Sequence, residues 1–172
     1  MKIILLGYMG SGKTAVGKRL APFMEMGFAD LDEMLAQREE RSILNLFKNK
    51  GEIYFRKLEN EILHELLEDP TDKVIALGGG TPCYGNNMEL IKNSGAKTIY
   101  LKSNLESLVN RLFAEKESRP LIAHLDTKTE LEDFIRKHLF ERTYFYQQSD
   151  FSILVDGKSI EKIVEEILLI LN

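Results

Sequence analysis

Near the start of the chain, residues 7–14 read Gly7-Tyr8-Met9-Gly10-Ser11-Gly12-Lys13-Thr14, which fits the pattern G-x-x-x-x-G-K-[ST] at every position. A short apolar run, residues 3–6, precedes the loop, and an amphipathic segment follows it. A strand, a glycine-rich loop and a helix in this order can hold phosphates, because glycines let successive backbone N–H groups face one anion. The pattern therefore predicts a nucleoside triphosphate site.

The residues at the end of this loop have separate expected roles. The helix that begins near Lys13 would direct its free N–H groups and the positive end of its dipole at the phosphates. Lys13 would reach the β- and γ-phosphates, and Thr14 would offer its hydroxyl to Mg²⁺. The other candidate nucleotide-binding residues are Gly10, Ser11, Gly12 and Ala15.

Composition limits the class of protein. The chain has 172 residues, of which 44% are hydrophobic and 29% charged, and its net charge is −4. This length predicts one α/β domain, and the absence of a basic block argues against a nucleic-acid partner. No apolar stretch approaches the roughly 20 residues that span a bilayer, so we expect no membrane contact. One cysteine, Cys83, suits a reducing compartment, and we expect a cytoplasmic location.

Two carboxylates follow the first helix. That helix is predicted over residues 13–24, ended by Gly27, and residues 28–32 then predict a short strand that carries Asp30 and Asp32. If the strand continued through both, the two carboxylates would point to the same side, which is costly unless a cation lies near them. A metal–nucleotide complex would supply that cation. The alternative is a strand end followed by a helix that Asp32 caps.

A glycine triplet follows the next predicted strand. Residues 33–67 predict helices with a break at Gly51 and an N-cap at Ser42, and they carry Arg56, a residue type that usually lies on the surface. Residues 74–77 predict a buried parallel strand that ends in Gly78-Gly79-Gly80. Three glycines leave bare backbone that a ligand can approach, although a tight turn is the alternative.

The second half of the chain predicts two more strands, at residues 98–101 and 151–155, and four helices. We expect these helices from Asn87 as N-cap, over residues 105–113, over residues 129–147, and from Ile160 to the end. Residues 114–126 lose helical periodicity, and a loop of this length is either a mobile lid or a flexible surface loop.

Five short strands that alternate with helices predict an α/β fold with one parallel sheet and helices on both faces. In such a sheet the carboxyl ends of all strands lie at one edge. The phosphate loop, the aspartates, the glycine triplet and the start of the lid would meet there. We expect residues 1–172 to form a single domain, with the lid as its only insertion.

Taken together, the motifs resemble those of the shikimate kinase family. The resemblance runs from Met1 to the last helix through GYMGSGKT, DLD (residues 30–32), GEIYFRKLE (51–59), GGG (78–80), RPL (119–121, with Pro120) and ER (141–142). It implies a P-loop kinase fold of the nucleoside monophosphate kinase type and phosphorylation of shikimate at its 3-hydroxyl by ATP with Mg²⁺. We expect the protein to be a monomer.

The resemblance implies a role for each residue that matches a family motif. Lys13 and Thr14 would hold ATP and Mg²⁺, with Asp30 near the metal directly or through water, and Asp32 would bind the shikimate hydroxyls and act as general base. Arg119 would swing over the transferring phosphate. The remaining carried-over residues are Arg56 and Arg142 at the shikimate carboxylate, Gly78, Gly79 and Gly80 beside the same substrate, and Arg111, Gly157 and Lys158 near the adenine.

The chain departs from the family pattern at a few positions. Glu39-Glu40 replaces a common Thr-Gly, Ile122 stands where the lid usually has a leucine, the lid lacks glycines after Phe113, and no proline follows Arg142 before Tyr146. None of these changes removes a chemical group from the expected site. The changes affect the parts of the resemblance that concern the movement of the lid and the contacts with adenine.

Two other functions remain possible. A related small-molecule kinase, such as a gluconate or nucleoside monophosphate kinase, shares the loop and the sheet, but the glycine triplet with Arg56 and Arg142 favours a compact anionic polyol as acceptor. A non-catalytic nucleotide-binding switch would need neither Asp32 nor a second anion site.

Overall fold

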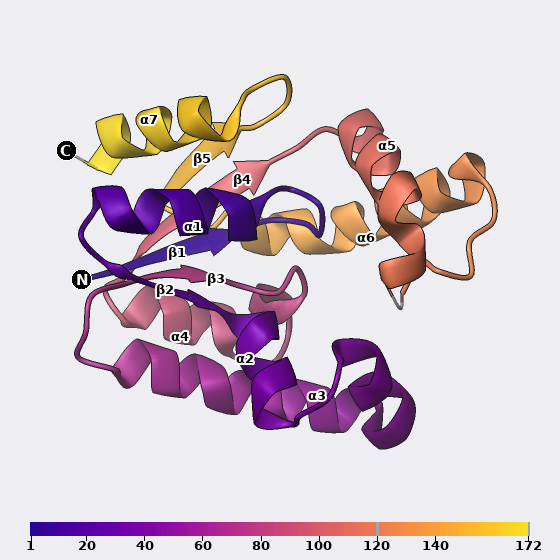
Figure 1. The fold of residues 1–172 in the computed structure, drawn as a ribbon, viewed down its shortest axis with the longest axis horizontal. Helices are drawn as coiled ribbons and strands as arrows, with labels where there is room; N and C mark the ends of the chain where they lie inside the picture. Colours follow the sequence, from indigo (N-terminus) through magenta and orange to yellow (C-terminus); the bar gives the residue numbers. More distant parts are fainter. Residues whose placement is uncertain (120, 172) are drawn as a thin grey trace.

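The computed structural model describes residues 1–119 and 121–171. Five strands form one parallel sheet in the order β2-β3-β1-β4-β5 (Figure 1). The strands are β1 (Lys2–Leu6), β2 (Gly27–Asp30), β3 (Lys73–Ala76), β4 (Lys97–Lys102) and β5 (Phe151–Leu154). The predicted α/β class with a five-stranded parallel sheet is confirmed.

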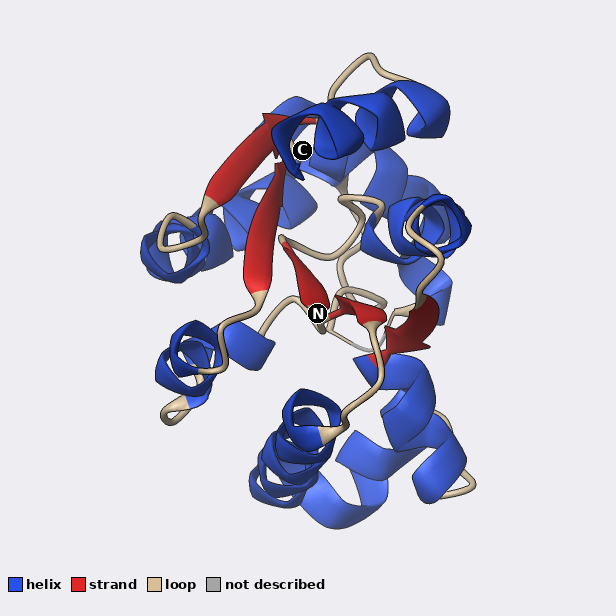
Figure 2. Cartoon of the chain, turned by 90° about the vertical axis from the view of Figure 1, so that its left-hand side faces the viewer, coloured by secondary structure: helices blue, strands red, loops and turns tan. Residues whose placement is uncertain are grey.

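Helices cover both faces of the sheet (Figure 2). On one face pack α1 (Lys13–Phe23) and α7 (Ile160–Leu171), and on the other pack α3 (Ile43–Glu68), α4 (Asn87–Asn93) and α6 (Lys128–Tyr146). The second group is extended by α2 (Leu31–Arg38), which contacts α3, and by α5 (Leu105–Glu115), which contacts α6. Two short 3₁₀ helices, η1 (Thr81–Cys83) and η2 (Lys116–Ser118), complete the described elements.

The central strand shows why the sheet is covered twice. Ile3 and Leu5 of β1 belong to the core under α1 and α7, whereas Ile4 and Leu6 belong to the core on the opposite face, and all four are fully buried. Side chains alternate along a strand, so a continuous apolar run supplies both cores. This rigid centre holds the loop that leaves β1 at its carboxyl end.

Several predicted helix boundaries are confirmed. Ser42 caps α3 by accepting a hydrogen bond from the N–H of Asn45, and Gly51 (φ 79°, ψ 173°) kinks that helix. Helix α6 begins at Lys128, one residue before its predicted start, after a reciprocal capping box between Thr127 and Glu130 that was not predicted from the sequence.

Two predicted boundary residues are wrong. The left-handed turn after α1 falls on Glu25 (φ 53°) rather than on Gly27, which already belongs to β2. Asn87 lies inside α4 after the N-cap Asn86, and its buried amide donates to the carbonyl of Thr81 at 2.8 Å. Gly27 instead pairs with β3, and Asn87 bonds to the chain just after the glycine triplet, so both residues have tertiary contacts that residue preference does not include.

The carboxyl ends of the strands lie at one edge of the sheet, as expected from their parallel order. The phosphate loop follows β1, Asp30 ends β2, and the glycine triplet follows β3. Across the described parts of the chain, no helix is both long and apolar enough to cross a membrane.

Candidate active site

The loop between β1 and α1 has a backbone that requires its glycines. Gly10 and Gly12 have φ angles of 79° and 92°, left-handed values that residues with a side chain rarely adopt. Gly12 is the N-cap of α1, so the unpaired N–H groups and the positive dipole end of this helix lie at the loop. All six candidate loop residues, 10–15, line a cavity of about 500 Å³, which we call the nucleotide cavity.

Lys13 lies folded against this loop. Its buried ammonium donates to the carbonyl oxygens of Gly7 (2.8 Å) and Tyr8 (2.9 Å). Burial lowers the pKa of Lys13 to about 8, while the carboxylates of Asp32 and Asp30 oppose that shift. An anion in the loop would stabilise the charged form of this lysine.

Asp30 connects the loop to the next helix. One of its oxygens accepts from the Thr14 hydroxyl (2.6 Å), and the other accepts from the backbone N–H groups of Asp32 (3.0 Å) and Glu33 (3.2 Å). Asp30 is therefore the N-cap of α2, and β2 ends there. The predicted strand through Asp32 is wrong, and so is the alternative in which Asp32 is the cap, because the Asp30 carboxylate already satisfies the first helical N–H groups.

Asp32 lies in the first turn of α2, at the boundary between the nucleotide cavity and a second cavity. Its pKa is raised to about 6, first because the surrounding protein displaces water, and then because the Asp30 and Glu59 carboxylates lie near it. The positive charges of Lys13 and Arg56 oppose this rise. A carboxylate whose pKa lies near neutrality, in a cleft, is suited to accept a proton.

The second cavity, which we call the acceptor cavity, has a volume of about 240 Å³. Met9, Asp32, Gly79 and Arg119 line both cavities, so the two spaces adjoin. The remaining walls combine two arginines with apolar side chains: Arg56, Arg142, Ile43, Phe47, Phe55 and Leu121 among them. This lining fits a small anionic molecule.

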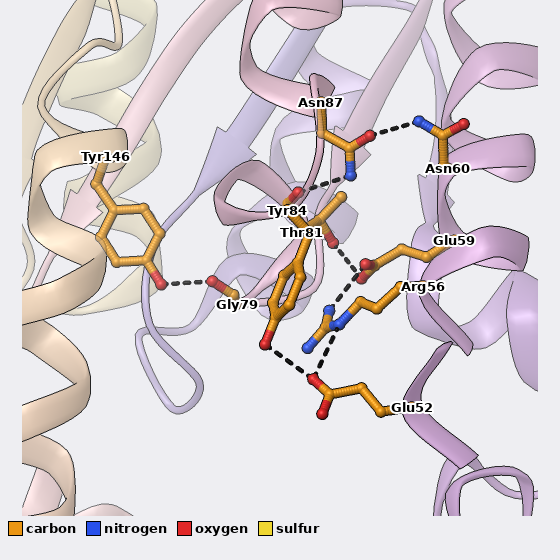
Figure 3. A network of polar contacts seen from close by, with 9 residues as sticks. All are labelled: Glu52, Arg56, Glu59, Asn60, Gly79, Thr81, Tyr84, Asn87 and Tyr146. Carbon is orange, nitrogen blue, oxygen red and sulfur yellow. Dashed lines mark hydrogen bonds and ion pairs between the residues drawn. The ribbon is translucent and has the colours of Figure 1, made fainter. Parts of the chain in front are cut away.

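Arg56 lines the acceptor cavity and is not a solvated surface residue, since its side chain is 15% exposed. Its Nη1 donates to Glu59 at 2.8 Å, and the other oxygen of Glu59 accepts from the Thr81 hydroxyl at 2.6 Å (Figure 3). Glu59 is 1% exposed. No role for Glu59 was predicted from the sequence, although its place one helical turn after Arg56 makes such a contact possible.

Arg142 enters the acceptor cavity from α6. It is buried, and its guanidinium carbon lies 5.6 Å from the centre of the Tyr8 ring. Among residues 1–119 and 121–171, no carboxylate lies within 4.0 Å of Arg142. A buried charge without a counter-ion costs free energy, and an anionic ligand in the cavity would recover part of it.

The glycine triplet leaves room for the charged groups around it. A Cβ atom on Gly78 would lie 2.8 Å from an oxygen of Asp32, and one on Gly80 would lie 2.9 Å from Nη2 of Arg56. The carbonyl of Gly79 accepts a hydrogen bond from the buried Tyr146 hydroxyl at 2.5 Å. At positions 78 and 80, glycine is therefore required by the protein side chains packed against the backbone.

The predicted lid contains more structure than its sequence suggested. Helix α5 continues to Glu115 and η2 follows it, so the expectation of an irregular chain from residue 114 is wrong at the start. Ile122 is fully buried and anchors the segment. Arg119 donates to Glu115 at 2.9 Å and lines both cavities, whereas Pro120, part of the RPL motif, lies outside the described residues.

Two of the three expected adenine-side residues line the nucleotide cavity. Arg111 donates to the carbonyl of Gly10 at 2.9 Å, and Lys158 pairs with Glu166 at 2.7 Å. Gly157 (φ 71°) precedes Lys158 in the turn after β5 and does not line the cavity. The apolar wall on this side, which the sequence analysis did not identify, consists of Val155, Ile160 and Ile163.

Comparisons with known proteins agree on one family. The sequence model of the shikimate kinase family matches residues 9–172. A shikimate kinase from Flavobacterium johnsoniae is 44% identical over 170 residues, which covers 99% of this chain and 98% of that protein.

Solved structures give the same result. The crystal structure of shikimate kinase from Bacteroides thetaiotaomicron has a TM-score of 0.91 and 36% identity, over 99% of this chain and 98% of that one. The shikimate kinase from Acinetobacter baumannii, solved in complex with shikimate, has a TM-score of 0.89 and 29% identity, over 99% and 92% of the two chains. By sequence, fold and site, the chain belongs to the shikimate kinase family.

Proposed function

We propose that this protein transfers the γ-phosphoryl group of ATP to the 3-hydroxyl of shikimate. The observation that carries the proposal is that a cavity with a phosphate loop adjoins a cavity with two arginines, and that Asp32 and Arg119 line both. Family membership makes the protein an ATP-using kinase. Shikimate is a small carboxylate with three ring hydroxyls, and an acceptor cavity of cations and bare backbone suits it.

ATP would bind along the phosphate loop. Residues 10–15 line the cavity in which the phosphates are expected, and an ATP phosphate would replace the carbonyl oxygens that the ammonium of Lys13 contacts. Arg111, Gly157 and Lys158 are proposed to border the adenine, with Val155 and Ile160 as its apolar support.

The residues beside the loop fit Mg²⁺. This ion usually takes one or two carboxylates together with substrate phosphates and waters. The hydroxyl of Thr14 and the carboxylate of Asp30 lie 2.6 Å apart and form such an oxygen set, and no further protein ligand is needed. When bound, Mg²⁺ would neutralise charge on the phosphates.

Asp32 is proposed as the general base. With its pKa raised to about 6, it is largely ionised at neutral pH and can accept the proton of the attacking hydroxyl. Its place between the two cavities suits a group that acts on an acceptor hydroxyl next to the γ-phosphate. Lys13 and Arg119 would neutralise the negative charge that the transferring phosphoryl group carries.

Arg56 and Arg142 are proposed to bind the shikimate carboxylate. Both guanidinium groups line the acceptor cavity, and a planar guanidinium can meet a carboxylate in a bidentate arrangement. Glu59 would hold Arg56 in place through its 2.8 Å contact. Gly78, Gly79 and Gly80 would let the ring of the substrate approach the backbone.

We also propose that residues 1–172 act as one P-loop kinase domain with a lid at 114–126. Arg119 is held by Glu115 in this structure and would exchange that partner for the γ-phosphate when the lid closes. Closure would keep water from taking the phosphoryl group. A monomeric state, a cytoplasmic location and the absence of membrane or nucleic-acid partners remain predictions from the sequence.

The test is a substrate panel. ADP release is measured with Mg·ATP and, separately, shikimate, quinate, gluconate and AMP. Release that depends on shikimate alone is expected. Faster release with gluconate or AMP would favour a related small-molecule kinase, and no release with any acceptor would favour a nucleotide-binding switch.

A further inference from the structure

Arg56 has an aromatic neighbour outside the motifs that define the site. The guanidinium carbon of Arg56 lies 3.7 Å from the centre of the Tyr84 ring, closer than the 5.1 Å that separates it from the ring of Phe55. Tyr84 follows η1, just after the glycine triplet, and its side chain is 37% exposed. Such a distance is typical of a guanidinium that lies over an aromatic face.

The hydroxyl of Tyr84 makes a second connection to the same arginine. It donates to Oε1 of Glu52 at 2.8 Å, and this oxygen lies 3.6 Å from Nε of Arg56 (Figure 3). Glu52 is one helical turn before Arg56 on α3. Tyr84 therefore contacts Arg56 directly through its ring and indirectly through Glu52.

Glu59 alone cannot fix the orientation of Arg56. It binds one terminal nitrogen, Nη1, and a guanidinium held at a single atom can still rotate about that contact. Nε of Arg56 is buried and has no hydrogen-bond partner in the described structure. A flat ring against the guanidinium restricts the remaining rotation, because stacking is favourable only while the two planar groups lie face to face.

We propose that Tyr84 is a positioning residue for substrate binding, which sets the plane of Arg56 so that it can meet the carboxylate of the acceptor. This inference rests on the proposed function, in which Arg56 binds that carboxylate. Bidentate binding needs a planar group presented in the correct orientation, and prior ordering of the arginine reduces the entropy lost on binding.

The chain offers a matched control in Tyr54, on the same helix as Arg56. Its ring lies 4.3 Å from the ammonium of Lys50, and its hydroxyl donates to Glu39 at 2.7 Å. This arrangement repeats the cation, ring and carboxylate of Tyr84, but Tyr54 does not line the acceptor cavity. Its removal should affect stability without affecting substrate binding.

The experiment measures steady-state kinetics for the wild type and for Tyr84→Phe, Tyr84→Ala and Tyr54→Ala, with thermal unfolding as a check of folding. For Tyr84→Ala we expect KM for shikimate to rise about tenfold, the size of a partly buried cation–π contact, with KM for ATP and kcat within about twofold. Tyr84→Phe keeps the ring, and its KM for shikimate should rise less than about threefold. Tyr54→Ala should leave both KM values within about twofold.

Different results overturn different claims. If the wild type phosphorylates shikimate and Tyr84→Ala keeps its KM for shikimate, the inference is wrong and the proposed function stands. An equal rise in both KM values would mean that Tyr84 merely supports the glycine loop. A wild type inactive on shikimate contradicts the proposed function, and the inference with it.

A double variant tests whether the effect passes through Arg56. In an Arg56→Lys background, Tyr84→Ala should raise KM for shikimate less than about threefold, because an ammonium has no plane to orient. The full tenfold effect in that background would contradict a role through Arg56.

Discussion

Replacing Asp32 with asparagine separates a general base from a structural carboxylate. Asparagine keeps the shape and the hydrogen-bonding reach of the side chain, but it cannot accept a proton at neutral pH. Loss of a positioned base reduces kcat by about 10²–10⁴-fold. Since Asp30, not Asp32, caps α2, the substitution leaves the helix cap intact.

The pKa of Asp32 sets the pH range over which the activity of the wild type should change. A carboxyl group with a pKa of about 6 is about nine-tenths ionised at pH 7, half ionised at pH 6 and about one-tenth ionised at pH 5. The base works when it is ionised, so kcat/KM of the wild type should rise with pH through 6 and then level off. The residual activity of Asp32→Asn should lack this rise.

The same pKa shift predicts the direction of a stability change. A carboxyl whose pKa is raised on folding destabilises the folded protein at pH values above that pKa, and the penalty disappears as the pH falls through about 6 toward 3.8. Asp32→Asn removes this charge, so its Tm at pH 7 should be higher than that of the wild type. Lost activity in a more stable protein cannot come from unfolding.

The assay is ADP release from pH 5 to pH 8, with Glu33→Gln as the matched control. Glu33 is the next carboxylate of the same helical turn, pairs with Lys18 at 2.8 Å and lines neither cavity. It should keep both the rate and the pH profile of the wild type. Near-normal turnover of Asp32→Asn, or a profile without a rise near pH 6 in the wild type, would refute the role of Asp32.

Five further substitutions test the rest of the site and the fold. Lys13→Ala should lower kcat about 10³-fold or more with an unchanged circular dichroism spectrum, and more than a tenth of the activity left would contradict its role at the phosphates. Arg119→Ala should lower kcat while shikimate binding by calorimetry changes little, and weak binding with normal kcat would place this arginine at the acceptor instead. Arg56→Lys and Arg142→Lys should each raise KM for shikimate far more than KM for ATP, with a loss of about 2–5 kcal/mol, and unchanged KM values would make both of them structural residues. Glu40→Gly should stabilise the protein by about 0.5–1 kcal/mol in urea unfolding, because Glu40 has φ 50° where glycine is unstrained, and a lower stability would show that its side chain compensates.

Local patterns predicted the elements whose sequence has one dominant period or a complete motif. The loop at residues 7–14 and the kink at Gly51 depend on backbone geometry that glycine alone supplies, and both are present as expected. The buried strand before the glycine triplet follows from its continuous apolar run.

Other features depend on contacts that no local pattern contains. The end of β2 was misjudged because the carboxylate of Asp30 can cap a helix as well as end a strand. Glu59 ends the GEIYFRKLE motif, but the motif does not reveal its partner, and only the fold brings Glu59 against Thr81. The stacking of Tyr84 on Arg56 joins residues 28 positions apart (84 minus 56), so it could not be predicted from spacing.

The central claim, phosphoryl transfer from ATP to the 3-hydroxyl of shikimate, is tested most directly by identifying the product. The protein is incubated with Mg·ATP and shikimate, and the reaction is followed by ³¹P NMR, with Lys13→Ala as the control. The account predicts a new phosphomonoester resonance coupled to the ring proton at carbon 3, equal in amount to the ADP formed and absent with Lys13→Ala. Inorganic phosphate as the only new product, or a phosphomonoester on another hydroxyl, would contradict it.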